Sequence, residues 1–152
     1  MLKGSEKMNI KNEMKICFKG ISENEGFART AVCAFAALLD PNMEEISDIR
    51  TAVSEAVTNC IVHAYRNKTG IVEISAKILD ENELYIKIKD KGCGIPDIKQ
   101  AMEPLFTTAP CEERAGLGFA VMESFMDSLK VSSKIDKGTT VIMRKKIGGQ
   151  NE

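Results

Sequence analysis

Two periodicities of hydrophobic residues divide the chain into predicted strands and predicted helices. Where every second residue is apolar, an extended chain presents one apolar face, so this alternation predicts β-strands. It covers residues 14–18, 71–79, 84–89, 131–135 and 139–145. Short polar segments join the second stretch to the third and the fourth to the fifth, which predicts two hairpins.

Apolar residues three or four positions apart predict helices between these strands. The first helix begins after Ser22, because Ser22 and Glu25 have the spacing of a capping box, and it ends at the break formed by residues 40–42. Along one side it carries Phe27, Ala31, Phe35 and Leu38.

A second and a third helix are predicted farther along the chain. Asn42 caps the second helix, with Glu45 at its third position, and the helical spacing of apolar residues continues to about Tyr65. The segment 97–115 is predicted to be irregular. It leads to the third helix, which is predicted to begin at Gly116-Leu117-Gly118.

The order of these elements is strand, two helices, hairpin, irregular segment, helix and hairpin. Helices grouped against hairpins favour an α+β fold, a two-layer sandwich with helices on one face of a mixed, mostly antiparallel sheet. A doubly wound parallel fold would need regular strand–helix alternation, which the pattern lacks. We expect one domain over residues 13–146, a flexible N-terminal leader over 1–12 and a C-terminal tail over 147–152.

Composition and charge narrow the class of protein. The 152 residues are 43% hydrophobic and 28% charged, which is typical of a globular domain with one core. A formal net charge of −1 provides no basic field for nucleic acid, and the longest apolar run, 31–39, is too short for a membrane span. Five cysteines without a C-x-x-C pair, and a polar N-terminus without a signal peptide, indicate reduced thiols in the cytoplasm.

Three polar residues on the second predicted helix are the first candidates for chemistry. Glu55, Asn59 and His63 are spaced four apart, so they line one side of a helix whose other residues are largely apolar. A carboxylate near an amide oxygen suits a hard cation and a proton transfer. Alone, such a ladder is usually a solvated helix face, and a single histidine such as His63 is more often structural.

Glycine-containing segments extend the candidate site. Asp90 precedes Gly92 and Gly94, which allow a flat ligand to approach the backbone, and its carboxylate suits an exocyclic amine such as that of adenine. Gly116 and Gly118 at a predicted helix start would leave N–H groups free to bind an anion. With Mg²⁺ bound by the amide of the ladder and by phosphates, these features together predict a nucleotide site.

These motifs, in this order, resemble the ATP-binding domain of the GHKL, or Bergerat-fold, superfamily of gyrases, histidine kinases and related ATPases. The matching residues are Glu55, Asn59 and His63 for its N-box, Asp90, Gly92 and Gly94 for its first glycine box, and Gly116-Leu117-Gly118 for its second. More narrowly, residues 12–145 resemble the anti-sigma F family of endospore-forming bacteria, whose members are also serine kinases. The runs that carry this resemblance are 24–29, 53–59, 104–108 and 114–127.

The resemblance implies a role for each matched residue. ATP or ADP would bind between the helices and the sheet, with Glu55 activating the serine hydroxyl of an anti-anti-sigma protein, Asn59 holding Mg²⁺ and Asp90 binding adenine. The residues implied in nucleotide contact are Asn59, Asp90, Gly92, Gly94, Thr107, Thr108, Gly116, Leu117, Gly118 and Thr139. The segment at about 104–115 would form the ATP lid, and Arg114 would stabilise charge at the γ-phosphate.

Protein partners are implied as well. Such proteins form homodimers that bind a sporulation sigma factor with ATP, and the dephosphorylated anti-anti-sigma protein with ADP. Glu25 and Arg29 match the partner-binding surface of the family. Two positions depart from the family pattern, because Ala64 replaces a common glycine after His63 and Cys93 replaces a larger residue between the paired glycines. Neither departure removes a contacting group.

Three other functions fit part of this pattern. A nucleotide-binding anti-sigma module would bind its sigma factor without transferring phosphate. A general-stress anti-sigma kinase would share the fold and the chemistry but differ in its partner. The catalytic domain of a histidine kinase would need a separate phosphate acceptor, because the single histidine lies in the ladder.

Overall fold

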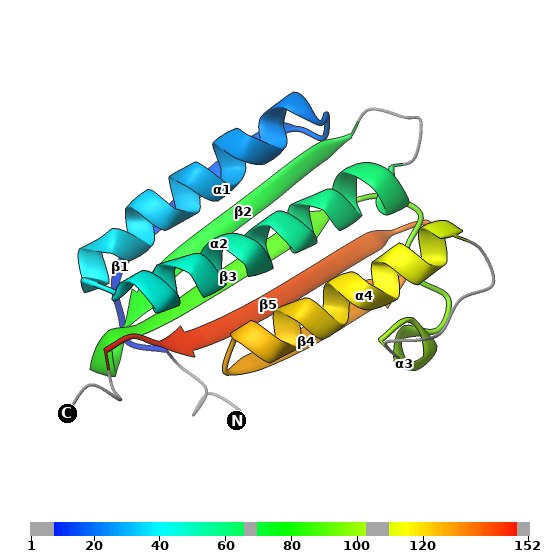
Figure 1. Cartoon of the computed structure of the whole chain (residues 1–152). Helices are drawn as coiled ribbons and strands as arrows, with labels where there is room; N and C mark the ends of the chain where they lie inside the picture. The colour runs from blue at the N-terminus through cyan, green and yellow to red at the C-terminus, as the bar shows by residue number, and fades with distance from the viewer. Residues whose placement is uncertain (1–7, 66–69, 103–109, 149–152) are drawn as a thin grey trace, which may run out of the picture.

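The computed structural model of the chain shows, in the part that it describes, a five-stranded antiparallel sheet (Figure 1). The strands lie in the order β1-β2-β3-β5-β4, and each neighbouring pair is antiparallel. They are β1 Ile10–Lys19, β2 Ile71–Leu79, β3 Glu83–Asp90, β4 Ser128–Lys134 and β5 Gly138–Lys146. The structure describes residues 8–65, 70–102 and 110–148, and for residues 110–117 only the backbone.

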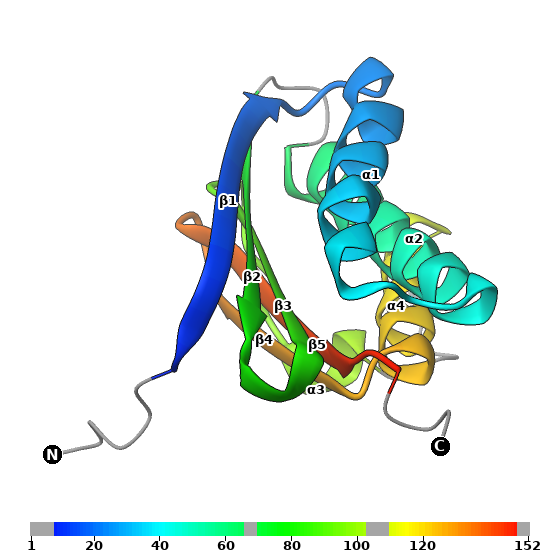
Figure 2. The ribbon, with the colours of Figure 1, turned by 90° about the vertical axis from the view of Figure 1, so that its left-hand side faces the viewer.

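The long helices of the described chain lie side by side on one face of this sheet, as the edge view in Figure 2 shows. They are α1 Glu23–Ala36, α2 Met43–Thr58 and α4 Pro110–Phe125, accompanied by the short α3 Ile98–Ala101. Shorter helical turns are η1 Ala37–Leu39, the π-helix η2 Asn59–Ala64, and η3 Asp80–Asn82. This arrangement confirms the predicted two-layer α+β sandwich.

A hydrophobic core fills the space between the two layers. The residues of β2 and β3 that the alternation predicts on one face are all buried, among them Ile74, Ile86 and Ile88 at 0–1% exposure. From the helical side, Ile49 and Val53 of α2 are fully buried against them. Each such side chain contributes about 1.5–3 kcal/mol of burial free energy, so the alternation of the hairpin and the apolar side of α2 together define the core.

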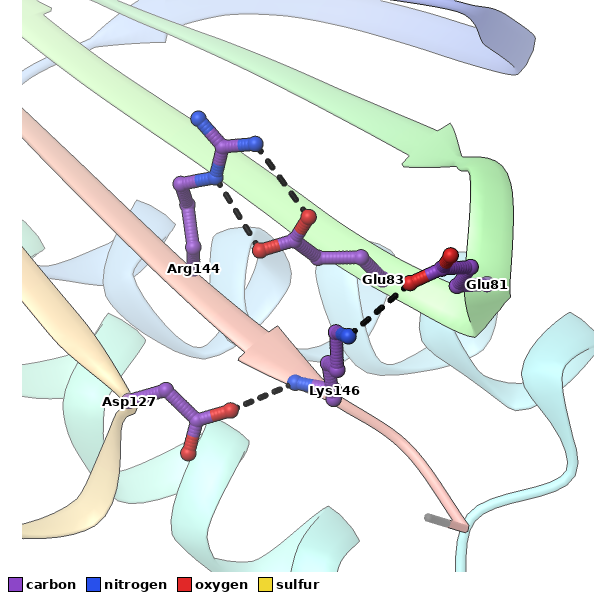
Figure 3. Close-up of polar contacts among 5 residues, drawn as sticks. All are labelled: Glu81, Glu83, Asp127, Arg144 and Lys146. Atoms are coloured by element: carbon purple, nitrogen blue, oxygen red, sulfur yellow. Dashed lines mark hydrogen bonds and ion pairs between the residues drawn. The ribbon is translucent and has the colours of Figure 1, made fainter.

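Ion pairs and hydrogen bonds tie together the end of the sheet where β3 begins, which we call the Glu83 end. Arg144 of β5 binds both carboxylate oxygens of Glu83 at 3.1 and 3.2 Å, and Lys146 pairs with Glu81 at 3.0 Å (Figure 3). The backbone N–H of Lys146 donates to Asp127 Oδ2 at 2.7 Å. These contacts join β5 to β3, to the turn η3 and to the α4–β4 connection.

Helix α1 differs from the prediction in its start and in its buried side. Ser22 has helical backbone angles and makes no side-chain cap, and the Glu25 N–H donates to the Ser22 carbonyl instead. The Glu25 carboxylate does not complete a capping box either, because it accepts hydrogen bonds from Ser54 and Arg29. The buried residues of α1 are Ala28, Val32 and Ala36, whereas Phe27 and Leu38 are 54% and 65% exposed. The Asn42–Glu45 capping box of α2 is confirmed by hydrogen bonds in both directions.

Two element boundaries also differ from the prediction. Strand β1 begins at Ile10, inside the predicted leader, because β2 extends far enough to pair Leu79 with Ile10. Helix α4 begins at Pro110, so the prediction of an irregular chain up to residue 115 and a helix start at Gly116 is wrong. Proline suits the first helical position, since its φ is already helical and no N–H is required there.

Candidate active site

The opposite end of the sheet, which we call the Asp90 end, holds part of the predicted site. Strand β3 ends at Asp90, directly opposite Thr139 near the start of β5. Helix α2 ends beside this edge and continues into η2, while α4 passes Gly118 close to α2. Residues distant in sequence therefore meet because an antiparallel pair places the end of one strand beside the start of the next.

Asp90 is a buried carboxylate held by backbone donors. It is 5% exposed, and its Oδ1 accepts hydrogen bonds from the N–H groups of Gly92 at 2.9 Å and Thr139 at 3.2 Å. Burial raises the pKa of Asp90, although these bonds and one from Cys60 oppose that effect. Among the described residues no lysine or arginine pairs with it, so the carboxylate lies buried without a countercharge.

The helix that carries the predicted ladder changes from an α-helix to a π-helix at Asn59. Residues 59–64 form a π-helix, in which Tyr65 N donates to Cys60 O, five residues earlier, at 3.1 Å. The prediction of a regular helix to about Tyr65 is therefore wrong after Thr58. Such π-turns occur frequently at functional sites, and this one begins at Asn59, a predicted nucleotide ligand.

Glu55, Asn59 and Gly118 meet where α4 packs beside the end of α2. A Cβ atom on Gly118 would lie 3.2 Å from Glu55 Oε1 and from Asn59 Nδ2, so the absence of a side chain there leaves room beside both groups. Asn59 Nδ2 is buried and has no hydrogen-bond acceptor among the described residues. The Glu55 carboxylate makes no ion pair with a described residue. Buried donors are normally satisfied, so this junction has the character of a ligand site.

The loop after β3 rests on the end of the π-helix. Cys93 N donates to Ala64 O at 3.0 Å, Cys93 Sγ donates to His63 O, and Lys91 N donates to the Tyr65 hydroxyl at 2.8 Å. A Cβ on Gly92 would lie 2.5 Å from Ala64 O, so glycine is required here by the chain's own packing. The loop that follows Asp90 is thereby fixed to the helix that carries Asn59.

The β4–β5 turn supports the same loop from the other side. Gly94 has a φ of +81°, and a Cβ there would lie 2.2 Å from Lys134 O. Ile95 N donates to Ser133 Oγ at 2.8 Å, and that hydroxyl lies 2.8 Å from Thr139 Oγ1. Sequence reasoning missed Ser133, because a serine on a polar strand carries no signal until its partner across the hairpin is known.

The remaining predicted site residues lie in or after the lid segment. Thr107 and Thr108 lie outside the described residues. Arg114, Gly116 and Leu117 belong to α4, and the structure describes only their backbone. Since α4 begins at Pro110, residues 116–118 are inside a helix, and the expected free N–H groups ahead of a helix start are not formed there.

Glu25 and Arg29, the predicted partner-binding residues, lie on α1. Arg29 Nη1 donates to both Glu25 carboxylate oxygens, at 2.6 and 2.8 Å, and Ser54 Oγ donates to the same carboxylate. Burial opposes ionisation of Glu25, yet the hydrogen bonds from Ser54 and Arg29 outweigh it and lower its pKa. The Glu25–Arg29 pair on α1 is thus hydrogen-bonded to Ser54 of α2, the residue that precedes Glu55.

The oxygen groups at this end fit a magnesium nucleotide. A hard cation prefers carboxylate, amide and phosphate oxygens, and Glu55 and Asn59 supply the first two beside an open glycine position. In the described part of the chain, no cluster of three or more His, Cys, Asp or Glu side chains would hold a metal by itself. An ion held by Glu55 and Asn59 would complete its shell with water and with oxygens of a bound ligand.

Comparison with known proteins defines the class. Residues 23–145 match the family of histidine kinase-like ATPase domains. Two solved structures share the fold. The RsbU and RsbW domains of a Mycobacterium tuberculosis protein match 90% of this chain, with a TM-score of 0.67 and 16% sequence identity. A blue-light activated histidine kinase of Erythrobacter litoralis matches 74% of this chain, with a TM-score of 0.58 and 23% sequence identity. The chain matches about a third of each of those longer chains, 32% and 33%.

Curated relatives place the chain more narrowly. An anti-sigma F factor of Caldanaerobacter subterraneus is 60% identical over 93% of this chain and 98% of its own length. One from Clostridium acetobutylicum is 54% identical over 90% and 95%. The chain therefore belongs to the anti-sigma F factor family of histidine kinase-like ATPase domains. Its described helices include none with the length and apolar character needed to cross a membrane.

Proposed function

We propose that this protein is an anti-sigma factor that inhibits a sporulation sigma factor and, as an ATP-dependent serine kinase, phosphorylates a small anti-anti-sigma protein. The observation that carries the proposal is the junction of Glu55, Asn59 and Gly118. Among the described residues, it presents a carboxylate without an ion pair and an amide whose buried nitrogen has no acceptor, at the same sheet end as Asp90. Such groups suit a ligand with phosphates at one end and an amine at the other.

Each group has a distinct task in this proposal. Glu55 orients the serine hydroxyl and accepts its proton as the oxygen bonds to the γ-phosphorus, while the bond from that phosphorus to the β,γ-bridging oxygen breaks and ADP leaves. Asn59 and the phosphates hold Mg²⁺, which neutralises phosphate charge when bound. Asp90 accepts a hydrogen bond from the adenine amine, with Gly92, Gly94 and Thr139 shaping that end of the site. Thr107, Thr108 and Arg114 of the lid cover the phosphates, Gly116 and Leu117 just after the lid line the same end of the site, and the Arg114 guanidinium stabilises the developing charge.

Partner binding is assigned to α1. Arg29 and Glu25 form a half-buried pair there, and Phe27 between them in sequence is 54% exposed. An exposed aromatic beside an arginine is typical of binding hot spots in protein interfaces. We assign the sigma factor and the anti-anti-sigma protein to this surface of a cytoplasmic homodimer, whose two copies would each contribute one α1.

The test is incubation of the chain with ATP, Mg²⁺ and the cognate anti-anti-sigma protein, followed by detection of phosphoserine by mass spectrometry. We expect one phosphoserine in the partner, and none when EDTA replaces Mg²⁺. Absence of phosphoserine with both proteins folded would contradict the kinase function. Sigma-factor binding retained under those conditions would identify a nucleotide-binding anti-sigma module instead.

A further inference from the structure

A row of polar side chains crosses β3, β5 and β4, three strands that lie side by side in Figure 1. Asp90 of β3 lies directly opposite Thr139 of β5, and Thr139 lies directly opposite Ser133 of β4. Residues directly opposite each other in an antiparallel sheet project from the same face. The next row on this face is apolar, with Ile88 and Val141 in the core. The face under the helices therefore changes from apolar to polar at the row that contains Asp90.

Ser133 connects this row to the loop that follows Asp90. Its Oγ accepts a hydrogen bond from Ile95 N at 2.8 Å, donates to Gly138 O at 3.1 Å and lies 2.8 Å from Thr139 Oγ1. Thr139 in turn donates its backbone N–H to Asp90 Oδ1 at 3.2 Å. Ser133 thus contacts both the loop after Asp90 and the residue that helps to hold the Asp90 carboxylate.

The number of protons on Ser133 determines the direction of its contact with Thr139. A serine hydroxyl carries one proton and can accept two hydrogen bonds. The carbonyl of Gly138 can only accept, so the Ser133 proton is used there, and the contacts with Ile95 N and Thr139 Oγ1 are both bonds that Ser133 accepts. The Thr139 hydroxyl therefore donates to Ser133. With its own proton used in this way, the Thr139 oxygen acts toward a ligand as an acceptor.

We infer that Ser133 is a positioning residue for base recognition, which holds the Thr139 hydroxyl so that its oxygen accepts a hydrogen bond from the exocyclic amine of adenine. The inference rests on the proposed function, in which Asp90 binds that amine. The amine carries two N–H groups and no acceptor in this role. The Asp90 carboxylate and the Thr139 oxygen, opposite each other in the sheet, provide one acceptor for each N–H group.

The experiment compares two nucleotides that differ only at the 6 position of the base. They are ADP and purine riboside diphosphate, in which hydrogen replaces the amine, and calorimetry measures the affinity of the full chain for each. We expect Ser133→Ala to bind ADP roughly threefold to tenfold more weakly, the loss expected for one hydrogen bond, and to bind the analogue as the wild type does. Ser133→Thr keeps the hydroxyl and should keep the wild-type ratio of the two affinities.

Two further variants separate this role from a general effect on the strand. Ser132→Ala makes the same change at the next residue of β4, whose exposed side chain lies on the opposite face, and should leave both affinities unchanged. Thr139→Val replaces the hydroxyl by a methyl group and should show the same selective loss for ADP. Adding Ser133→Ala to Thr139→Val should not change the ratio further, because Ser133 acts through Thr139.

Different results overturn different statements. If the wild type prefers ADP but Ser133→Ala weakens both nucleotides equally, Ser133 only anchors the loop through Ile95, so the positioning role is wrong and the proposed function stands. Unchanged affinities in Ser133→Ala would overturn the positioning role in the same way. A wild type that binds the analogue as tightly as ADP would overturn this inference together with the assignment of Asp90 to the amine. Absence of ADP binding by the folded wild type would overturn the proposed function itself.

Discussion

The two ends of the sheet use polar residues in opposite ways. At the Glu83 end, Arg144 and Glu83 form a bidentate pair, and Lys146 binds Glu81 through its ammonium and Asp127 through its backbone N–H (Figure 3). At the Asp90 end, the Glu55 carboxylate and the Asp90 carboxylate make no ion pair within the described chain. Charged side chains are thus paired at the Glu83 end, whereas the two carboxylates at the Asp90 end have no countercharge among the described residues.

We therefore interpret the paired groups at the Glu83 end as stabilising the fold, and the groups at the Asp90 end as binding a ligand. A polar side chain whose partners belong to its own chain contributes to folding, whereas a buried group without them costs stability unless something binds it. Asn59 Nδ2 and the raised pKa of Asp90 are two independent signs of that cost. Substitutions at the Asp90 end should therefore change activity more than stability, and substitutions at the Glu83 end should do the reverse.

The largest effect is expected from Glu55→Gln. The amide keeps the size of the side chain but is a far weaker base, so we expect serine phosphorylation to fall by about 10²–10⁴-fold while ADP binds as before. Phosphotransfer and ADP affinity are measured on the same preparation.

Glu83→Gln is the matched control, since it makes the same chemical change at the other end of the sheet. It should transfer phosphate at the wild-type rate. Retained activity in Glu55→Gln would remove Glu55 from the role of base, and equal losses in both variants would show that the two ends are not functionally distinct.

Asp90→Asn should lose nucleotide affinity without losing stability. Hydrogen bonds to a charged group are worth about 1.5–3 kcal/mol, so we expect ADP to bind roughly tenfold to a hundredfold more weakly. Because burial raises the pKa of Asp90 above 3.8, its ionised form disfavours folding at neutral pH. That cost is relieved as the pH falls through the folded-state pKa.

The stability of nucleotide-free Asp90→Asn therefore has a defined pH dependence. At neutral pH the variant should unfold at the same temperature as the wild type or higher, and the difference should shrink as the acid range is entered. Thermal unfolding at several pH values measures this directly. A variant that is less stable than the wild type at neutral pH would show that Asp90 is needed for the fold.

The sequence predicted those parts of the molecule that depend on local pattern. Alternation identified the hairpin strands, since a half-buried strand shows its period in a single segment, and the four-residue spacing brought Glu55 and Asn59 to one side of α2. The π-turn at Asn59 has no such local signal. It accompanies contacts between η2 and the loop after β3, such as Cys93 N to Ala64 O, which come from distant segments.

Tertiary contacts also overrode local chemistry in α1. Ser22 and Glu25 have the spacing of a capping box, yet Glu25 binds Ser54 on α2 instead, because a hydrogen-bonded carboxylate between two helices has more partners there than at a helix end. Ser133 was missed for the same reason. Its partner, Thr139, lies on the neighbouring strand, so Ser133 is not conspicuous in its own segment.

Gly118→Ala tests the comparison of the two sheet ends by adding one methyl group at the Asp90 end. The new Cβ would lie 3.2 Å from both Glu55 Oε1 and Asn59 Nδ2, which must then shift by a few tenths of an ångström. Small displacements of catalytic groups are costly, so we expect phosphotransfer to fall severalfold, to about a tenth of the wild-type rate. Steady-state assays with the anti-anti-sigma protein measure the change.

Gly26→Ala is the matched control for that methyl group. Gly26 also lies within a helix, but a Cβ there meets nothing within 4 Å. It should raise the free energy of unfolding by about 0.5–1 kcal/mol, since alanine favours the helix. Because α1 is assigned to partner binding, the comparison uses the phosphotransfer rate at saturating anti-anti-sigma protein, which should be unchanged. If both variants lost activity equally, helix propensity rather than crowding at Glu55 and Asn59 would be the cause.

The smallest effect is expected from the stability of Glu83→Gln. Its pair with Arg144 is partly exposed, at 21% and 37% for the two side chains, so we expect a loss of about 0.2–1 kcal/mol in the free energy of unfolding. Urea denaturation at low and high salt measures this, and salt should shrink the difference because it screens exposed charges. Loss of ADP affinity in this variant would mean that the ion pair acts on Asp90 along β3. In that case the Glu83 end would affect ligand binding as well as stability, and the two ends would be coupled through β3.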